Sequence, residues 1–282
     1  MKALKKPTVS AEDSYRACLS GVLKVGLKAR IQNFEEYYLE AAEQYLGFAG
    51  KSLLYTFEKF DGADDDVVFS EVTKGELKSF YTYYMVDESK PGRDIYLKIK
   101  NSAAICPICG FGHVYTLDHY LPKAKYPALS ILPVNLVPAC QDCNKIKREG
   151  APSSLGAQVI HPYFDRDRII NDQWLFARLE TIDPVTFEFY VSTPYAWPPE
   201  LVDRVNSHFR DYQLARRFAV QAAEGFSSLR EQLRSSMRLG GCSLRDLIWD
   251  MSTSALISAP NSWYSAMCQA LARSNNFCSS KP

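Results

Sequence analysis

The stretch that decides the fold of this chain is CPICGFGHVYTLDHYLPKAKYPALSILPVNLVPACQDCNKIK, residues 106–147 of 282. A Cys-x2-Cys pair stands near each end, and the four cysteines are Cys106, Cys109, Cys140 and Cys143. Four thiolates at this spacing typically bind one Zn²⁺ in tetrahedral geometry. Because four thiolates leave the zinc no open position, the sequence predicts a structural metal and not a catalytic one.

An Asp-His dipeptide lies between the two cysteine pairs, where a zinc knuckle has no need of one. Asp118 and His119 follow an apolar, strand-like run from Val114 to Leu117. Hydrolysis of a phosphodiester needs a base that activates water and a hard divalent cation that stabilises the leaving oxygen. Imidazole suits the first task at neutral pH, and a neighbouring carboxylate suits the binding of Mg²⁺.

Two asparagines complete the pattern. Asn135 is expected at the start of a second short strand, Val134 to Val137, and Asn144 directly follows the last cysteine, where a helix should begin. The order Cys-x2-Cys, Asp-His, Asn, Cys-x2-Cys-Asn-x2-Lys resembles the motif of the HNH nucleases, whose ββα-metal fold carries Asp-His on one strand, Asn on the next and His or Asn on the helix.

The resemblance implies a role for each of these residues. His119 would be the general base, Asp118 a ligand of a catalytic Mg²⁺ or Mn²⁺, and Asn144 a second ligand through its amide oxygen. Asn135 would brace the hairpin and orient His119. The family often has His at the last motif position, and the oxygen of Asn144 favours Mg²⁺ or Mn²⁺ over softer metals.

The charge of the chain is nearly balanced, with 33 Lys and Arg against 32 Asp and Glu. A free-standing DNA-binding protein usually carries a strong basic excess. If this chain acts on DNA, the positive potential must be local, or a partner must hold the nucleic acid. Candidates for local phosphate contacts cluster around the motif: Lys123, Lys125, Lys145, Lys147 and Arg148.

The whole sequence predicts an α+β fold that is mostly helical. Residues 1–100 are expected to form a helical region, 101–170 an HNH core with its zinc, and 171–282 a β-hairpin followed by helices. Ser10 is expected to cap the first helix, and further helices are predicted at about 34–45, 51–59, 76–86 and 201–234. The absence of a long apolar run and of a secretory signal predicts a cytoplasmic protein without a membrane span.

The chain also resembles the HNH proteins of bacterial antiphage systems, including the HNH subunit of Septu-type and retron-associated systems. The basis is the Lys-Pro opening, the central zinc motif and His161-Pro-Tyr-Phe-Asp after it. This resemblance implies a partner ATPase of the ABC or SMC-like type. We therefore expect a DNA endonuclease, although the residues do not distinguish DNA from RNA. A stand-alone restriction-type nuclease and a non-catalytic zinc-ribbon subunit are the alternatives, and His161 is expected to be structural.

Overall fold

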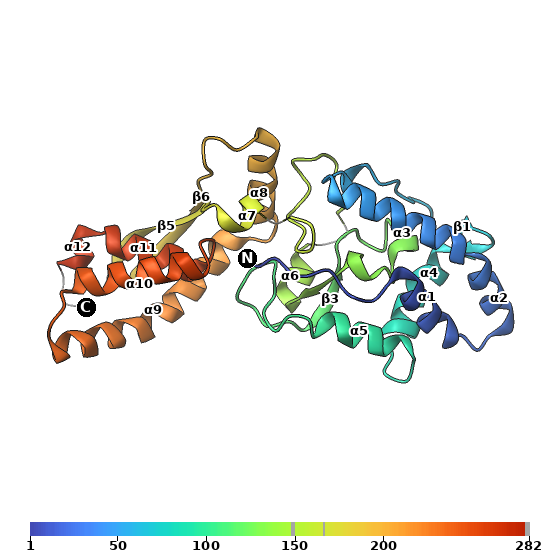
Figure 1. Ribbon diagram of the computed structural model, residues 1–282, viewed down its shortest axis with the longest axis horizontal. Helices are drawn as coiled ribbons and strands as arrows, with labels where there is room; N and C mark the ends of the chain where they lie inside the picture. The colour runs from blue at the N-terminus through green and yellow to red at the C-terminus, as the bar shows by residue number, and fades with distance from the viewer. Residues whose placement is uncertain (148–149, 166, 280–282) are drawn as a thin grey trace. The chain divides into compact units, whose positions relative to one another are not determined.

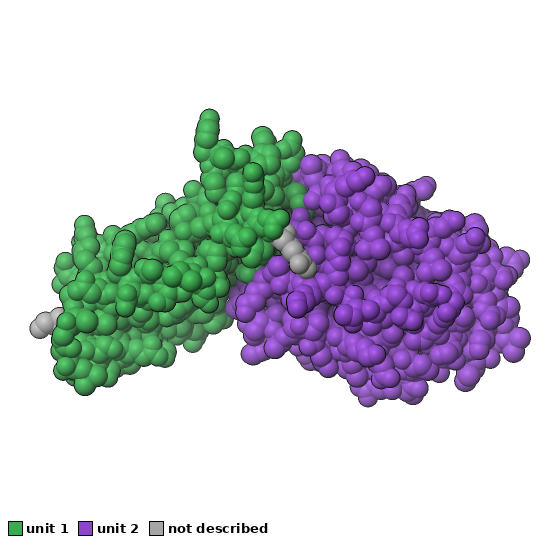
Figure 2. All heavy atoms as spheres, viewed as in Figure 1, with its two compact units in different colours: residues 1, 166–282 green, residues 2–165 purple. Residues whose placement is uncertain are grey.

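The structure, a computed structural model, describes residues 1–147, 150–165 and 167–279. The chain divides into two compact units, residues 2–165 and residues 166–282 with Met1 (Figure 2). Helices predominate, and the described strands pair in two-stranded antiparallel sheets, which confirms the predicted mostly helical α+β class. No helix in this described part is long and apolar enough to cross a bilayer.

The unit of residues 2–165 is mostly helical before its central sheet (Figure 1). Of the expected regions 1–100 and 101–170, residues 2–100 and 101–165 lie in this one unit, and the boundary expected near residue 170 lies close to the division between the units. As predicted, Ser10 caps the first helix and accepts a hydrogen bond from the Asp13 amide at 2.9 Å. The early elements are α1 (Ala11–Ser20), α2 (Val25–Asn33), α3 (Glu35–Gly50), the short helix η1 (Leu54–Thr56), β1 (Val67–Phe69) and β2 (Val72–Thr73).

Two of the predicted helices in this unit differ from the structure. The helix predicted at 51–59 is wrong, because Ser52 takes a left-handed φ of 59° and only a three-residue 3-10 helix follows. The helix predicted at 76–86 is in fact two: α4 (Lys74–Ser79), opened by a capping box of Thr73 and Glu76, and the π-helix η2 (Phe80–Val86).

A small ββα arrangement follows α5 (Gly92–Lys100). Strands β3 (Thr116–His119) and β4 (Leu136–Ala139) are antiparallel, with His119 opposite Leu136 and Thr116 opposite Ala139. Two short helices, η3 (Pro127–Leu129) and η4 (Pro133–Asn135), lie in the connection between them, and α6 (Gln141–Ile146) begins directly after β4. Helix α5 contacts both strands and α6 contacts β3, so the Asp-His dipeptide lies in a packed framework.

The unit of residues 166–282 is built on the predicted hairpin, β5 (Leu175–Ile182) and β6 (Val185–Val191). Helix α9 packs on β6 and α11 on β5. The single helix predicted at 201–234 is wrong, because Gln213 has a φ of 53° and divides it. Tyr212 and Leu214 are both buried, and residues two apart face different sides of a continuous helix. The helices are α7 (Asp167–Asn171), α8 (Pro199–Asp211), α9 (Leu214–Leu239), α10 (Leu244–Ser258), α11 (Trp263–Arg273) and α12 (Asn275–Cys278).

Candidate functional site

The four cysteines of the two Cys-x2-Cys pairs form one buried cluster. The Sγ atoms of Cys106, Cys109, Cys140 and Cys143 all lie within 4.8 Å of one another. A tetrahedral zinc with Zn–S bonds of about 2.3 Å places its sulfurs about 3.8 Å apart. The Sγ atoms of Cys109 and Cys140 are separated by 3.8 Å. The cluster could therefore hold a metal ion such as zinc.

The turns around the cluster explain how two short sequence pairs meet. Gly110 has a φ of 78° and its amide bonds to the Cys106 carbonyl at 2.8 Å, a geometry that glycine adopts without strain. A Cβ on Gly112 would lie 2.9 Å from the Cys140 Cβ, so a larger side chain has no space there. The Cys140 Sγ also caps α6, because it accepts a hydrogen bond from the Cys143 amide at 3.4 Å.

The thiols of the cluster shift one another's pKa. Hydrogen bonding with Cys106 lowers the pKa of Cys109, and it lowers that of Cys140 to about 6. A hydrogen bond with Cys109 raises the pKa of Cys106. A hydrogen bond with Cys106 likewise raises the pKa of Cys143. A divalent cation among the four sulfurs offsets the repulsion of their charges and favours four thiolates, the state that binds zinc.

The His119 imidazole has a defined hydrogen bond. Its Nε2 lies 2.8 Å from the backbone carbonyl oxygen of Ser130, and the residue is 9% exposed. A carbonyl oxygen can only accept, so Nε2 carries the proton and Nδ1 has a free lone pair. The Tyr81 ring packs edge-on at 4.5 Å between ring centroids. Burial lowers the pKa of His119 to about 3. The charges of Lys123 and Lys147 lower it further, and the hydrogen bond to Ser130 acts in the opposite direction.

Asp118 is paired with a buried lysine. The Lys147 Nζ lies 3.1 Å from Oδ2 of Asp118, and it also donates to the carbonyls of His119 at 2.6 Å and Tyr120 at 2.7 Å. The two paired side chains are 10% and 11% exposed. Burial raises the pKa of Asp118, which Lys147 opposes, and burial lowers the pKa of Lys147, which Asp118 opposes. This lysine connects α6 to the end of β3.

Substitution of Lys147 by methionine should destabilise the chain by about 3–5 kcal/mol, because it leaves the buried Asp118 charge without its partner. The measurement is urea unfolding of the full-length protein. Lys145→Met is the matched control, since Lys145 lies two residues earlier and is exposed. Its effect should stay within about 0.5 kcal/mol. Equal losses in the two variants would contradict the pairing.

The two asparagines of the motif have different surroundings. Asn135 is fully buried in η4, just before β4 and not at the start of a strand as predicted. Its Oδ1 accepts from the Leu121 amide at 2.7 Å, and its Nδ2 donates to the carbonyls of Leu121 and Leu129. It thus braces the connection between the strands, while the Ser130 carbonyl orients His119 directly.

Asn144 lies within α6 and is half-buried. Residues three apart on a helix share a face, so Asn144 lies on the same face as Lys147. Because the Lys147 Nζ reaches Asp118, that face turns toward β3. Asn144 and Asp118 therefore lie on two elements that contact each other, α6 and β3.

The predicted phosphate-contact residues are not equivalent. Lys145 is exposed, and Lys123 is half-buried with its Nζ 3.3 Å from Thr82 Oγ1 and 4.8 Å from the Tyr81 ring centroid. Lys125 is paired with Asp61, and Lys147 is buried against Asp118. A phosphate contact by Lys147 would have to compete with the bonds that its ammonium group already makes, and the predicted contacts of the four described lysines stay predictions. Arg148 lies outside the described residues.

The residues that bind and orient Asp118 and His119 were not predicted from the sequence. Ser130 contributes a backbone oxygen, which no side-chain pattern signals, and the Asn-x2-Lys spacing was the available signal for Lys147. His161 is buried and has a structural environment: its Nδ1 accepts from the Tyr163 amide at 3.2 Å, and Tyr120 stacks on it at 4.0 Å. Its Nε2 lies 3.0 Å from the Tyr45 hydroxyl.

Comparison with known proteins gives one similarity along the full length. No family model matches the sequence. No solved structure matches it either. The chain is 28% identical over 293 residues to Protein ea31 of Escherichia phage lambda, an alignment that covers 98% of this chain and 99% of that protein. The name of that protein states no activity, so the function must be argued from the site.

Proposed function

We propose that this chain is a metal-dependent nuclease of the HNH type that hydrolyses phosphodiester bonds, with DNA as the expected substrate. One observation carries the proposal: His119 stands at the end of β3 with its proton fixed on Nε2 by the Ser130 carbonyl. The other ring nitrogen, Nδ1, is then the acceptor that a general base needs. A purely structural zinc ribbon has no use for such an arrangement next to a carboxylate.

The neighbouring residues supply the rest of the chemistry. A Mg²⁺ or Mn²⁺ bound here would stabilise the charge on the leaving oxygen. Asp118 and Asn144 offer the hard oxygen ligands that such ions prefer. A carboxylate has about four acceptor positions, so Asp118 can keep its bond to Lys147 and still bind a metal. The four cysteines would hold a structural Zn²⁺ that fixes the start of α6 relative to β3 and β4.

The test is cleavage of supercoiled plasmid DNA, and of RNA in parallel, by the purified full-length chain with and without Mg²⁺. Cleavage should require the metal. The cleavage rate of Asp118→Asn should be at least about tenfold lower than that of the wild type at limiting Mg²⁺, because substitution of a residue that merely supports a metal ligand already costs this much. Asp142→Asn, at an exposed position in the first turn of α6, is the matched control and should cut normally. Cleavage that needs neither Mg²⁺ nor Asp118 would contradict the proposal.

The predicted antiphage role and the partner ATPase of the ABC or SMC-like type are a further part of the proposal. The near-neutral net charge supports a partner that helps to hold the nucleic acid. If the isolated chain does not cut, the assay is repeated with the product of the neighbouring gene. Cleavage that begins on addition of that product supports a regulated effector. No cleavage in either case leaves the zinc-ribbon binding subunit as the better account.

A further inference from the structure

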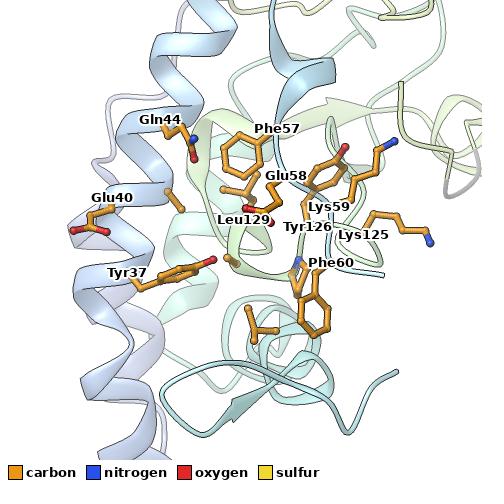
Figure 3. Close-up of a pocket in the computed structure, with 14 residues that line it drawn as sticks. Tyr37, Glu40, Gln44, Phe57, Glu58, Lys59, Phe60, Lys125, Tyr126 and Leu129 are labelled. Carbon is orange, nitrogen blue, oxygen red and sulfur yellow. The ribbon is translucent and has the colours of Figure 1, made fainter. Parts of the chain in front are cut away.

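A cavity of about 580 Å³ lies in the unit of residues 2–165, between α3 and the connection of the two site strands. This volume is in the range of small-molecule sites, about 300–1,000 Å³. The residues at its wall from α3 include Tyr37 and Gln44, and those across from them include Glu58, Phe60 and Tyr126 (Figure 3). None of these belongs to the HNH-like motif.

Flat rings and a carboxylate face this cavity. Phe69 stacks on Tyr37 with 4.7 Å between centroids and 13° between planes, which fixes the Tyr37 ring at the wall. In Figure 3 the side chains of Tyr37 and Glu58 point toward each other from opposite sides. The two interact electrostatically, since burial first and then the charge of Glu58 raise the pKa of Tyr37. An aromatic platform beside a hydrogen-bond acceptor suits the face and edge of a planar heterocycle.

The polar groups of the wall fit such a ligand. Glu58 accepts from an exocyclic amino group, and the Gln44 amide can donate or accept. Lys59 extends on the side opposite α3, where a phosphate attached to the heterocycle would find a cation, and Lys125, which is paired with Asp61, extends on the same side (Figure 3).

The cavity is also connected to the candidate catalytic base. Its wall includes Lys125 to Leu129, and the next residue, Ser130, provides the carbonyl that orients His119. Leu129 is itself held by Asn135, which donates to its carbonyl at 3.2 Å. A ligand in the cavity would therefore contact the same short segment that positions the imidazole.

We infer that this cavity binds one nucleotide, with the nucleobase stacked on Tyr37 and its edge bonded to Glu58. The inference rests on the proposed function, because a nuclease binds strands that are made of nucleotides. The nucleotide has two possible sources, a free nucleotide or an unstacked base of the bound strand. Base stacking on an aromatic side chain typically contributes enough affinity that loss of the ring lowers binding by about tenfold or more.

The experiment measures binding by the full-length chain without added Mg²⁺, so that no cleavage occurs. One arm titrates the four nucleoside monophosphates by calorimetry. The other titrates a single-stranded oligonucleotide that contains 2-aminopurine, whose fluorescence changes when its ring stacks. Tyr37→Ala and Glu58→Gln are compared with the wild type. The matched controls are Tyr83→Ala, at a tyrosine 60% exposed, and Glu43→Gln, at an exposed glutamate outside this cavity.

Each outcome has a defined meaning. If the two cavity variants lose binding of free nucleotides by about tenfold and the controls do not, the site is for a free nucleotide. If they lose only the stacking signal of the oligonucleotide, it receives a base of the strand. If neither ligand depends on Tyr37 and Glu58, the inference is wrong. If the chain binds nucleotides through Tyr37 and Glu58 but never cleaves nucleic acid, the nuclease proposal is wrong and the nucleotide site stands. If the chain cleaves but does not bind nucleotides in this cavity, the nucleotide site is wrong and the nuclease proposal stands.

Discussion

Replacement of Cys143 by serine should remove the bound zinc and abolish cooperative unfolding of the unit of residues 2–165. Cys143 is fully buried in the four-sulfur cluster, and its amide bonds to the sulfur of Cys140 at the start of α6. The apparent binding free energy of structural zinc is about 10–16 kcal/mol, which equals or exceeds the net stability of most domains at about 5–15 kcal/mol. Zinc content by elemental analysis and thermal unfolding by circular dichroism measure the two effects.

The matched control for this variant is Cys18→Ser. Cys18 is equally buried and lies in the same unit but outside the cluster. Its substitution should cost about 1–3 kcal/mol, since it buries a hydroxyl, and should leave about one zinc per chain. A Cys143→Ser chain that still holds one zinc and unfolds like the wild type would show that the cluster does not hold a structural metal.

Replacement of His119 by alanine should lower the rate of Mg²⁺-dependent cleavage by about 10²–10⁴-fold, the usual contribution of a general base. Zinc content should not change, because His119 lies outside the cysteine cluster. The rate is measured under single-turnover conditions on plasmid DNA, with circular dichroism to establish that the variant folds.

Ser130→Ala gives a specific control for the orientation of His119. It keeps the backbone carbonyl that fixes the imidazole and removes only the side-chain bond from Ser130 Oγ to the Leu77 carbonyl at 2.9 Å. Its cleavage rate should stay within about tenfold of the wild type, well above that of the alanine variant of His119. If His119→Ala cuts as fast as Ser130→Ala, then His119 is not the base.

The sequence predicted the local parts of the site better than the surroundings. The spacing of the cysteines was sufficient to predict the cluster, because both pairs form tight local turns. The Asp-His strand was likewise marked by nearby residues, whereas the helix expected to begin at Asn144 begins three residues earlier, at Gln141. The partners of these residues come from elsewhere in the chain, such as Ser130, which accepts through its backbone. Backbone acceptors have no side-chain signature, so a sequence pattern cannot predict them.

The errors in the helices have a similar origin. Ser52 and Gln213 both adopt left-handed backbone conformations, although neither is a glycine or asparagine that would signal one. Tertiary packing decides these positions: Leu214, next to Gln213, is completely buried. Lys147 was predicted to contact phosphate because it belongs to a cluster of basic residues around the motif. In the structure it is nearly buried, and its ammonium group is bound by a carboxylate and two carbonyls, partners that a buried lysine requires.

The π-helix at Phe80–Val86 has a consequence for alignments of related sequences. This segment brings Tyr81 edge-on to His119 and buries Met85, while Tyr83 is 60% exposed. Since successive side chains of a helix point in different directions around its axis, deletion of one residue here would turn one of the buried side chains away from its contact. A relative with a gap in this segment should therefore have different side chains packed around its histidine, whereas a relative that differs only at position 83 should keep the same packing.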